Sequence, residues 1–272
     1  MKLAKALTIA GSDSGGGAGI QADLKTFQEL GVYGMSAITA ITAQNTLGVQ
    51  GVYPLTPAAV AQQIESVASD LAPDAAKTGM LFSSEIMKET AVQIKRYHIQ
   101  KLVVDPVMIA KGGAVLLEEE AIRTLKEYLL PLALVVTPNI PEAEKITGLS
   151  ISSFNERKEA AKILHEHGAS YVVIKGGHAD VQDDIVVDLL YDGYMFTELV
   201  GKRVDTAHTH GTGCTFAAVM TAELAKGAPV TEAAQTARHY IQAALEHPLG
   251  LGQGHGPTNH WAYGRRQGKV RI

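Results

Sequence analysis

Short apolar stretches alternate with longer amphipathic stretches along most of the chain. The short stretches are rich in Val, Ile and Leu and have the usual length of strands, whereas the longer ones repeat their apolar positions with helical spacing. The pattern predicts strands at 4–10, 35–43, 74–77, 101–105, 132–137, 171–175 and 184–191. It predicts helices at 18–30, 57–71, 84–98, 118–129, 141–147, 155–167, 213–226 and 231–246.

Several predicted helices carry their own start or stop signals. Either Ser83 or Ser84 is placed to cap the third helix, because a serine hydroxyl accepts a hydrogen bond from a first-turn amide. Gly31, Gly148 and Gly168 follow predicted helices, where a residue with positive φ ends the helix most easily. The sequence therefore indicates where several of the predicted helices begin or end.

The alternation itself predicts an α/β fold of three layers. Strand, helix, strand repeats pair strands in parallel through right-handed crossovers, so helices cover both faces of the sheet. Asp192-Gly193 is a hairpin signal between 185–191 and 195–199, and it predicts an antiparallel edge. Because no linker divides the chain, we expect a single domain over 1–272, with ligands at the carboxyl ends of the strands.

Composition excludes several classes of function. With 46% apolar and 19% charged residues the chain is globular, and its net charge of −4 gives no general attraction for nucleic acid. The apolar run at 6–10 is too short for a signal peptide, and polar residues interrupt the uncharged stretch 30–64, so no membrane association is expected. A single cysteine excludes an internal disulfide and fits the cytoplasm.

Two glycine-rich loops each lie between a predicted strand and helix. The first, 11–19, fits neither GxGxxG, since Ile20 stands at the third glycine, nor the P-loop, since Gly17 stands at the lysine. We read it as a loop that lets a ligand approach its backbone amides, against the alternative of a plain flexible turn. The second loop, 205–214, leads into a helix and predicts an anion site.

The second loop also places the cysteine. Gly211, Thr212 and Gly213 precede Cys214, so unpaired amides of the helix start converge where a phosphoryl group would be transferred. A thiol in a first helical turn is expected to have a lowered pKa. The alternative for Cys214 is a small buried residue without chemistry.

Charged residues at strand ends complete the candidate site. Asp105 ends one strand and Glu142 heads a short helix, so both are candidate ligands of Mg²⁺, although Glu142 is equally suited to capping that helix. Lys175 closes another strand and suits a nucleotide phosphate. The spacing of His208 and His210 lacks a third metal ligand, which favours a histidine beside the polyphosphate over a transition-metal site.

A family resemblance rests on motifs spread over nearly the whole chain: Gly11-Ser12-Asp13, 15–23, Lys77-Thr78-Gly79-Met80, Asp105-Pro106-Val107, Thr137-Pro138-Asn139 with Glu142, and Gly211-Thr212-Gly213-Cys214. Together they resemble the hydroxymethylpyrimidine/phosphomethylpyrimidine kinases of thiamine biosynthesis, in the ribokinase-like superfamily. The resemblance implies ATP and Mg²⁺ as cosubstrates and two successive phosphorylations of 4-amino-5-hydroxymethyl-2-methylpyrimidine. It also implies a homodimer.

The resemblance assigns roles to residues. Catalysis falls to Cys214 with Gly211, Thr212 and Gly213, either through a thiolate base or through an oxyanion hole that the thiol assists. The implied pyrimidine site contains Gly11, Asp23, Gln44, Met80 and Val107. The implied nucleotide site contains Lys175, Asn139, Thr209 and His210. Segments 46–53 and 111–115 are expected to close over the site.

Gln44 separates the two activities that we consider first. Its amide offers donors and an acceptor in one plane, which complement the amine and ring nitrogen of an aminopyrimidine. Pyridoxine lacks that amine, so it would leave the amide partly unpaired at a cost of about 1 to 3 kcal/mol. A pyridoxine or pyridoxal kinase is the alternative enzyme, and a sensor without catalysis is the alternative outside enzymes.

Overall fold

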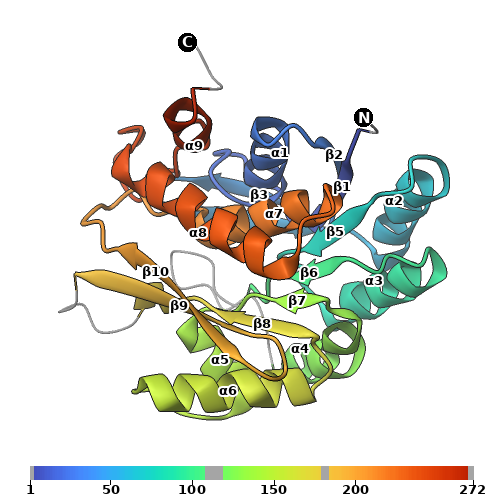
Figure 1. Cartoon of the computed structure of the whole chain (residues 1–272). Helices are drawn as coiled ribbons and strands as arrows, with labels where there is room; N and C mark the ends of the chain where they lie inside the picture. Colours follow the sequence, from blue (N-terminus) through green and yellow to red (C-terminus); the bar gives the residue numbers. More distant parts are fainter. Residues whose placement is uncertain (1–2, 108–118, 179–183, 269–272) are drawn as a thin grey trace.

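An eight-stranded sheet forms the centre of the molecule (Figure 1). The computed structural model describes residues 3–107, 119–178 and 184–268. The strands lie in the order β10-β9-β8-β7-β6-β5-β1-β2. Their bounds are β1 (Lys5–Ala10), β2 (Tyr33–Ile38), β5 (Ala75–Thr78), β6 (Leu102–Val104), β7 (Val135–Val136), β8 (Tyr171–Ile174), β9 (Ile185–Tyr191) and β10 (Phe196–Lys202). Pairing is parallel from β2 to β8, and β9 is antiparallel to both neighbours, which confirms the predicted sheet.

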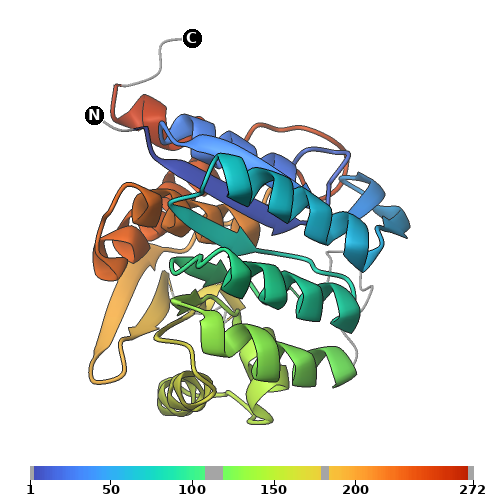
Figure 2. The same cartoon turned by 90° about the vertical axis from the view of Figure 1, so that its right-hand side faces the viewer.

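Helices cover both faces of this sheet (Figures 1 and 2). One layer contains α2 (Pro57–Asp70), α3 (Ser84–Arg96), α4 (Glu119–Thr124), α5 (Ile140–Thr147) and α6 (Phe154–Glu166). The other contains α1 (Gly19–Glu29), α7 (Thr212–Ala225), α8 (Val230–Glu246) and α9 (Ala262–Arg266). The predicted three-layer α/β/α arrangement is confirmed.

The sheet separates two apolar cores, because successive strand residues point to opposite faces. In β1, Leu7 and Ile9 pack into the core beneath α2 and α3, and Ala6 packs into the core beneath α7. All three side chains are fully buried. Burial on both faces explains why these strands appear in the sequence as continuous apolar runs.

Helix α7 is apolar on all sides. Ten of its 14 residues are buried, and small side chains such as Ala217, Ala218 and Ala222 let it pack closely between the sheet, α1 and α8. Its first residues emerge at the carboxyl ends of the strands. The packing of the whole helix therefore fixes the position of its N-terminus.

The predicted strand 35–43 is wrong. The chain bends at Thr39, whose N–H donates to the Ala10 carbonyl and whose carbonyl accepts from the Leu55 N–H. Beyond the bend, β3 (Ala40–Asn45) pairs with β4 (Gly48–Pro54) in a separate antiparallel hairpin. Segment 46–53, which we expected to be a closing loop, belongs mostly to this hairpin, and segment 111–115 lies outside the described residues.

Other deviations are local. The predicted helix 118–129 becomes α4 followed by a π-helical turn, Leu125–Leu129, and a 3₁₀ turn around Pro131. The sequence pattern missed α9. Ser83 rather than Ser84 caps α3, its hydroxyl accepting from Ile86 N–H at 3.3 Å.

The predicted stop signals and hairpin are present. Gly31, Gly148 and Gly168 have φ values of 71°, 77° and 108°, which confirms the glycine stop signals. Asp192 and Gly193 lie in the loop that joins β9 to β10. Among the described helices, none is long and apolar enough to cross a membrane.

Candidate active site

A cleft of about 590 Å³ opens at the carboxyl ends of β1, β5, β6 and β8, between the β3–β4 hairpin and α7. It brings together nearly every residue that the sequence nominated for the site. Its lining includes Gly11, Gln44, Met80, Asp105, Val107, Asn139, Glu142, Lys175, Thr209, His210, Gly211, Thr212, Gly213 and Cys214.

Asp23 is not among the residues that line this cleft, and its role as a pyrimidine contact stays a prediction. Its carboxylate is fully buried below the site, accepting from Lys77 Nζ at 3.0 Å and from Thr8 Oγ1 at 2.6 Å. Burial raises the pKa of Asp23, and the Lys77 ammonium works against that rise. Helical spacing in α1 points Asp23 inward, where Lys77 supplies the counter-charge.

The N-terminus of α7 forms one wall of the cleft. Gly211 caps the helix with a φ of 81°, and it lies so close to Gly17 that a Cβ at position 211 would overlap the Gly17 carbonyl oxygen. No side chain of the described residues caps this helix end. The Thr212 N–H donates to the Thr209 carbonyl at 3.3 Å, so the amides of Gly213 and Cys214 are the first-turn donors that remain for the anion site predicted from the glycines.

The expectation of a lowered pKa for Cys214 is wrong. The thiol lies in this first turn, but burial raises its pKa to about 11. The nearby carboxylates of Asp105 and Asp23 add to the rise, and Lys77 together with a hydrogen bond from the Gly19 backbone only partly offsets it. The thiol is therefore protonated at neutral pH.

Asp105 and Lys175 form an ion pair at the floor of the cleft. Lys175 Nζ donates to Asp105 Oδ1 at 3.0 Å, and Asp105 is 2% exposed. Burial disfavours the lysine charge, but Asp105 and Glu142 outweigh it and raise the pKa of Lys175. Among the described residues Asp105 Oδ2 has no hydrogen-bond partner, although it is buried near Gly213. A buried oxygen of this kind suits a hard cation or a water bound to one.

Glu142 and Asn139 cap α5 and also line the cleft. Asn139 Oδ1 accepts from Glu142 N–H at 2.9 Å, and Glu142 Oε2 accepts from Asn139 N–H at 2.8 Å. The capping role that we considered as the alternative for Glu142 is present, and its role as a metal ligand stays a prediction. An isolated bridge pairs Asn139 with Lys175, so these two predicted nucleotide contacts lie side by side.

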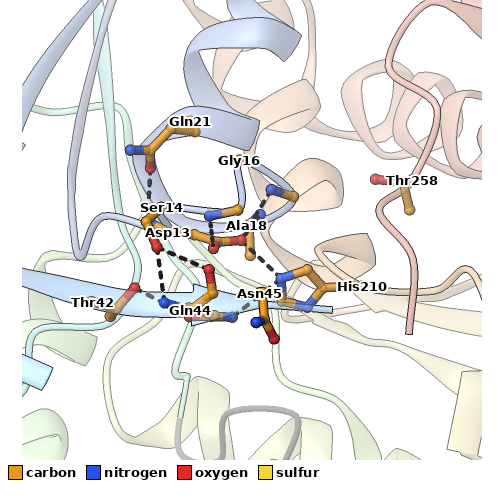
Figure 3. A network of polar contacts seen from close by, with 12 residues as sticks. Asp13, Ser14, Gly16, Ala18, Gln21, Thr42, Gln44, Asn45, His210 and Thr258 are labelled. Carbon is orange, nitrogen blue, oxygen red and sulfur yellow. Dashed lines mark hydrogen bonds and ion pairs between the residues drawn. The ribbon is translucent and has the colours of Figure 1, made fainter. Parts of the chain in front are cut away.

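Gln44 also lines the cleft and lies in β3 beside the first glycine loop (Figure 3). The ends of its amide lie 3.3 Å from Thr42 Oγ1 and 3.2 Å from His210 Nε2. His210 Nε2 also lies 2.9 Å from Asp13 Oδ2. The sequence assigned His210 to the nucleotide, whereas the structure places its ring between Asp13 and Gln44.

A model of the family described as phosphomethylpyrimidine kinase matches residues 13–259. The chain belongs to this family. A hydroxymethylpyrimidine/phosphomethylpyrimidine kinase of Bacillus subtilis (strain 168) is 57% identical over 265 residues and 97% of each chain is covered. One from Haemophilus influenzae is 56% identical over 262 residues, with 95% of this chain and 97% of the other covered.

A solved pyridoxal kinase also resembles this member of the phosphomethylpyrimidine kinase family. The structure from Staphylococcus aureus, in complex with AMP-PCP and pyridoxal, superposes with a TM-score of 0.90 at 42% identity. The comparison covers 97% of this chain and 96% of the other. The ribokinase-like fold is therefore shared by two vitamin kinase activities.

Two groups of cleft residues escaped the sequence analysis. The Asp13 carboxylate accepts hydrogen bonds from three backbone amides of the first glycine loop. In the sequence, only the position of Asp13 before those glycines indicates this role. Asp188 accepts from Gly176 N–H at 2.7 Å and lies 3.5 Å from Arg238 Nη1 at the far end of the cleft. Alternation in β9 turns Asp188 to the α8 face, yet its partners are distant in sequence.

Proposed function

We propose that the chain transfers the γ-phosphoryl group of ATP to the hydroxyl of 4-amino-5-hydroxymethyl-2-methylpyrimidine, and then a second phosphoryl group to the monophosphate. One observation carries the proposal: a single cleft joins the Gln44 amide to the α7 N-terminus and the Asp105–Lys175 pair. Family membership and the names of the bacterial relatives support it.

The α7 N-terminus is the proposed place of phosphoryl transfer. The amides of Gly213 and Cys214 stabilise negative charge on the transferred oxygens, and Lys175 adds a full positive charge nearby. Asn139 and Thr209 line the same part of the cleft and are assigned to the nucleotide. The AMP-PCP complex of the pyridoxal kinase supports a nucleotide in this fold.

Of the two mechanisms for Cys214, the structure favours assistance over a preformed thiolate base. Its pKa of about 11 keeps the thiol protonated, so the thiol can donate a hydrogen bond to an oxygen at the helix start. Because phosphoryl transfer passes through a loose transition state, the attacking alcohol need not lose its proton in advance.

The donor set fits Mg²⁺ through Asp105. Mg²⁺ takes oxygen ligands, keeps several waters and is typically held by one or two carboxylates together with phosphate oxygens. Asp105 has an unpaired buried oxygen, whereas one oxygen of Glu142 is committed to the α5 cap. We therefore assign Asp105 as the direct or water-mediated ligand and Glu142 as a neighbouring charge. When bound, the ion neutralises charge on the phosphates.

Pyridoxal or pyridoxine phosphorylation is the second candidate, favoured by the 42% identical pyridoxal kinase structure. A coupled ADP-release assay with hydroxymethylpyrimidine, its monophosphate, pyridoxine and ribose decides between them. We expect the highest kcat/KM with hydroxymethylpyrimidine, turnover of the monophosphate, and a smaller gap to pyridoxine in Gln44→Met. Equal rates with hydroxymethylpyrimidine and pyridoxine would contradict the specificity assigned to Gln44. If ATP is turned over with none of the four compounds, a sensor without catalysis is favoured.

We also propose a homodimer. The β3–β4 hairpin exposes Ile41, Leu47 and Tyr53, with 48%, 68% and 63% of their surfaces accessible. A second copy would cover this apolar surface. Sedimentation velocity of the purified chain tests the proposal: a dimer supports it, and replacement of Leu47 by Asp is expected to weaken that dimer.

A further inference from the structure

Asp13 links the first glycine loop to the Gln44 side of the cleft (Figure 3). Its Oδ1 accepts from Gly15 N–H at 2.9 Å, and its Oδ2 accepts from Gly17 and Ala18 N–H at 3.0 and 2.8 Å. The same Oδ2 lies 2.9 Å from His210 Nε2, and Asp13 is only 3% exposed. Three backbone N–H groups donate to this carboxylate whatever the tautomer of His210, so the carboxylate is ionised.

An ionised Asp13 fixes the proton on the His210 ring. A carboxylate only accepts, so the ring nitrogen 2.9 Å away must carry a hydrogen. This holds whether the imidazole is neutral or charged, since Nε2 is protonated in both cases. The single hydrogen on His210 Nε2 points to Asp13, so an acceptor beside this nitrogen can share that hydrogen, whereas a second donor there finds no lone pair.

Gln44 lies beside that donor, 3.2 Å away. With the amide nitrogen toward His210, as Figure 3 draws it, two donors face each other. The same orientation turns the amide oxygen to Thr42 Oγ1, whose single hydrogen is already donated to Ser12 carbonyl at 2.7 Å. Turning the amide by half a turn lets its oxygen share the Nε2 hydrogen with Asp13 in a three-centre hydrogen bond, and it lets the amide nitrogen donate to Thr42. The two ends of an amide are distinguished by such partners.

We propose that Asp13, through His210, holds the Gln44 amide with its oxygen toward His210, and so sets the hydrogen-bond pattern offered to the pyrimidine. This inference rests on the proposed function, because it assigns specificity within the same site. One hydrogen of the amide nitrogen and one lone pair of its oxygen remain for a ligand. An aminopyrimidine supplies the complementary acceptor and donor, whereas pyridoxine has no amino group.

His210 is held firmly enough to act in this way. Its backbone N–H donates to Gly256 carbonyl at 3.1 Å, and its carbonyl accepts from Thr258 N–H at 3.1 Å, which pins the residue to the C-terminal loop. Gly17 packs against the ring, since a Cβ at position 17 would lie 2.6 Å from His210 Cδ2. Loop, ring and amide form one connected unit.

A double-mutant comparison tests this unit. Selectivity is measured as the ratio of kcat/KM for hydroxymethylpyrimidine to kcat/KM for pyridoxine. His210→Phe keeps a ring but loses the donor, so we expect the ratio to fall about tenfold or more. His210→Gln restores N–H donors to both Asp13 and Gln44 and should recover part of the ratio. In a Gln44→Met background, His210→Phe should change the ratio less than twofold.

The control is His255→Gln, an exposed histidine of the neighbouring loop, which should leave the ratio unchanged. An unchanged ratio in His210→Phe, or an equal fall in the Gln44→Met background, overturns the proposal while the kinase function stands. If the unsubstituted protein does not phosphorylate hydroxymethylpyrimidine, the proposed function fails instead.

A second measurement uses the unsubstituted protein and so does not depend on the folding of a kinetic variant. Nitrogen-15 NMR of the ligand-free protein reports which ring nitrogen of each histidine carries a proton. We expect His210 Nε2 to be protonated at pH 7, with the signal assigned by its loss in His210→Gln. An Nε2 of His210 without a proton overturns the proposal whatever the kinetics of the variants.

Discussion

Cys214 is the only cysteine in the chain, so alkylation measures its thiol directly. The perturbation is a change of pH, and the reagent is iodoacetamide, which reacts with thiolates. Burial, together with the Asp105 and Asp23 carboxylates, raises the pKa of Cys214 to about 11 from an ordinary value of 9.0. We therefore expect its alkylation to be slow at neutral pH and to accelerate steadily as the pH rises.

The size of the effect follows from the thiolate fraction. At pH 8 a pKa of about 11 leaves about one thiol in a thousand ionised, against about one in ten for an ordinary cysteine. Alkylation should be about a hundredfold slower than in an unfolded peptide with one cysteine. Because partial burial also slows the reagent at every pH, the pH dependence is more informative than the absolute rate.

The assay follows labelling by mass spectrometry between pH 6.5 and 9.5. We expect the rate to rise about tenfold per pH unit across this range, with no labelling of Cys214→Ser. A rate that levels off below pH 9 would refute the reasoning, because the thiol would then ionise as an ordinary or activated cysteine. It would also restore the thiolate base as the mechanism.

Three other perturbations have defined outcomes. Gly211→Ala places a Cβ onto the Gly17 carbonyl oxygen at a φ of 81°, so thermal unfolding should show a loss of stability and kcat should collapse; a normal kcat contradicts this. Lys77→Met leaves the Asp23 carboxylate buried without its counter-charge and should lower the free energy of unfolding in urea by about 3 to 5 kcal/mol, most of it recovered when Asp23→Asn is added. Burial lowers the pKa of His260 to about 4, so protonation of the unfolded chain should reduce stability by about 3 kcal/mol as the pH falls from 6.5 to 4, and His260→Gln should flatten that dependence.

Most of the fold could be predicted because its signals are local. The apolar runs of β1 and β6, the cap at Ser83 and the glycine stops lie within a few residues of the elements they define. The break at Thr39 has no such signal, since no glycine, proline or charge interrupts 35–43. Its cause is a pair of hydrogen bonds to Ala10 and Leu55, which the fold brings together.

The candidate site divides in the same way. The loops before α1 and α7 were recognisable from their glycines, and they do line the cleft. The environment of Asp23 was not recognisable from the sequence, because Lys77, the counter-charge of its buried carboxylate, is 54 residues away. The pKa of Cys214 also depends on burial and on distant carboxylates, which here outweigh its helix position. Contacts between charged residues that are far apart in the sequence are therefore harder to predict here than the backbone geometry of the loops.

The burial of α7 has a consequence for how this protein tolerates change. Ten of its residues lie in the core, and the same helix begins at the place proposed for phosphoryl transfer. A substitution at Met220, two turns from Gly213, that altered packing would tilt or shift the helix and thereby displace the amides of its first turn. Activity should therefore decline with core volume changes along α7 before global unfolding is detectable. Directed evolution for thermostability would need to leave this helix alone and work on the outer helices.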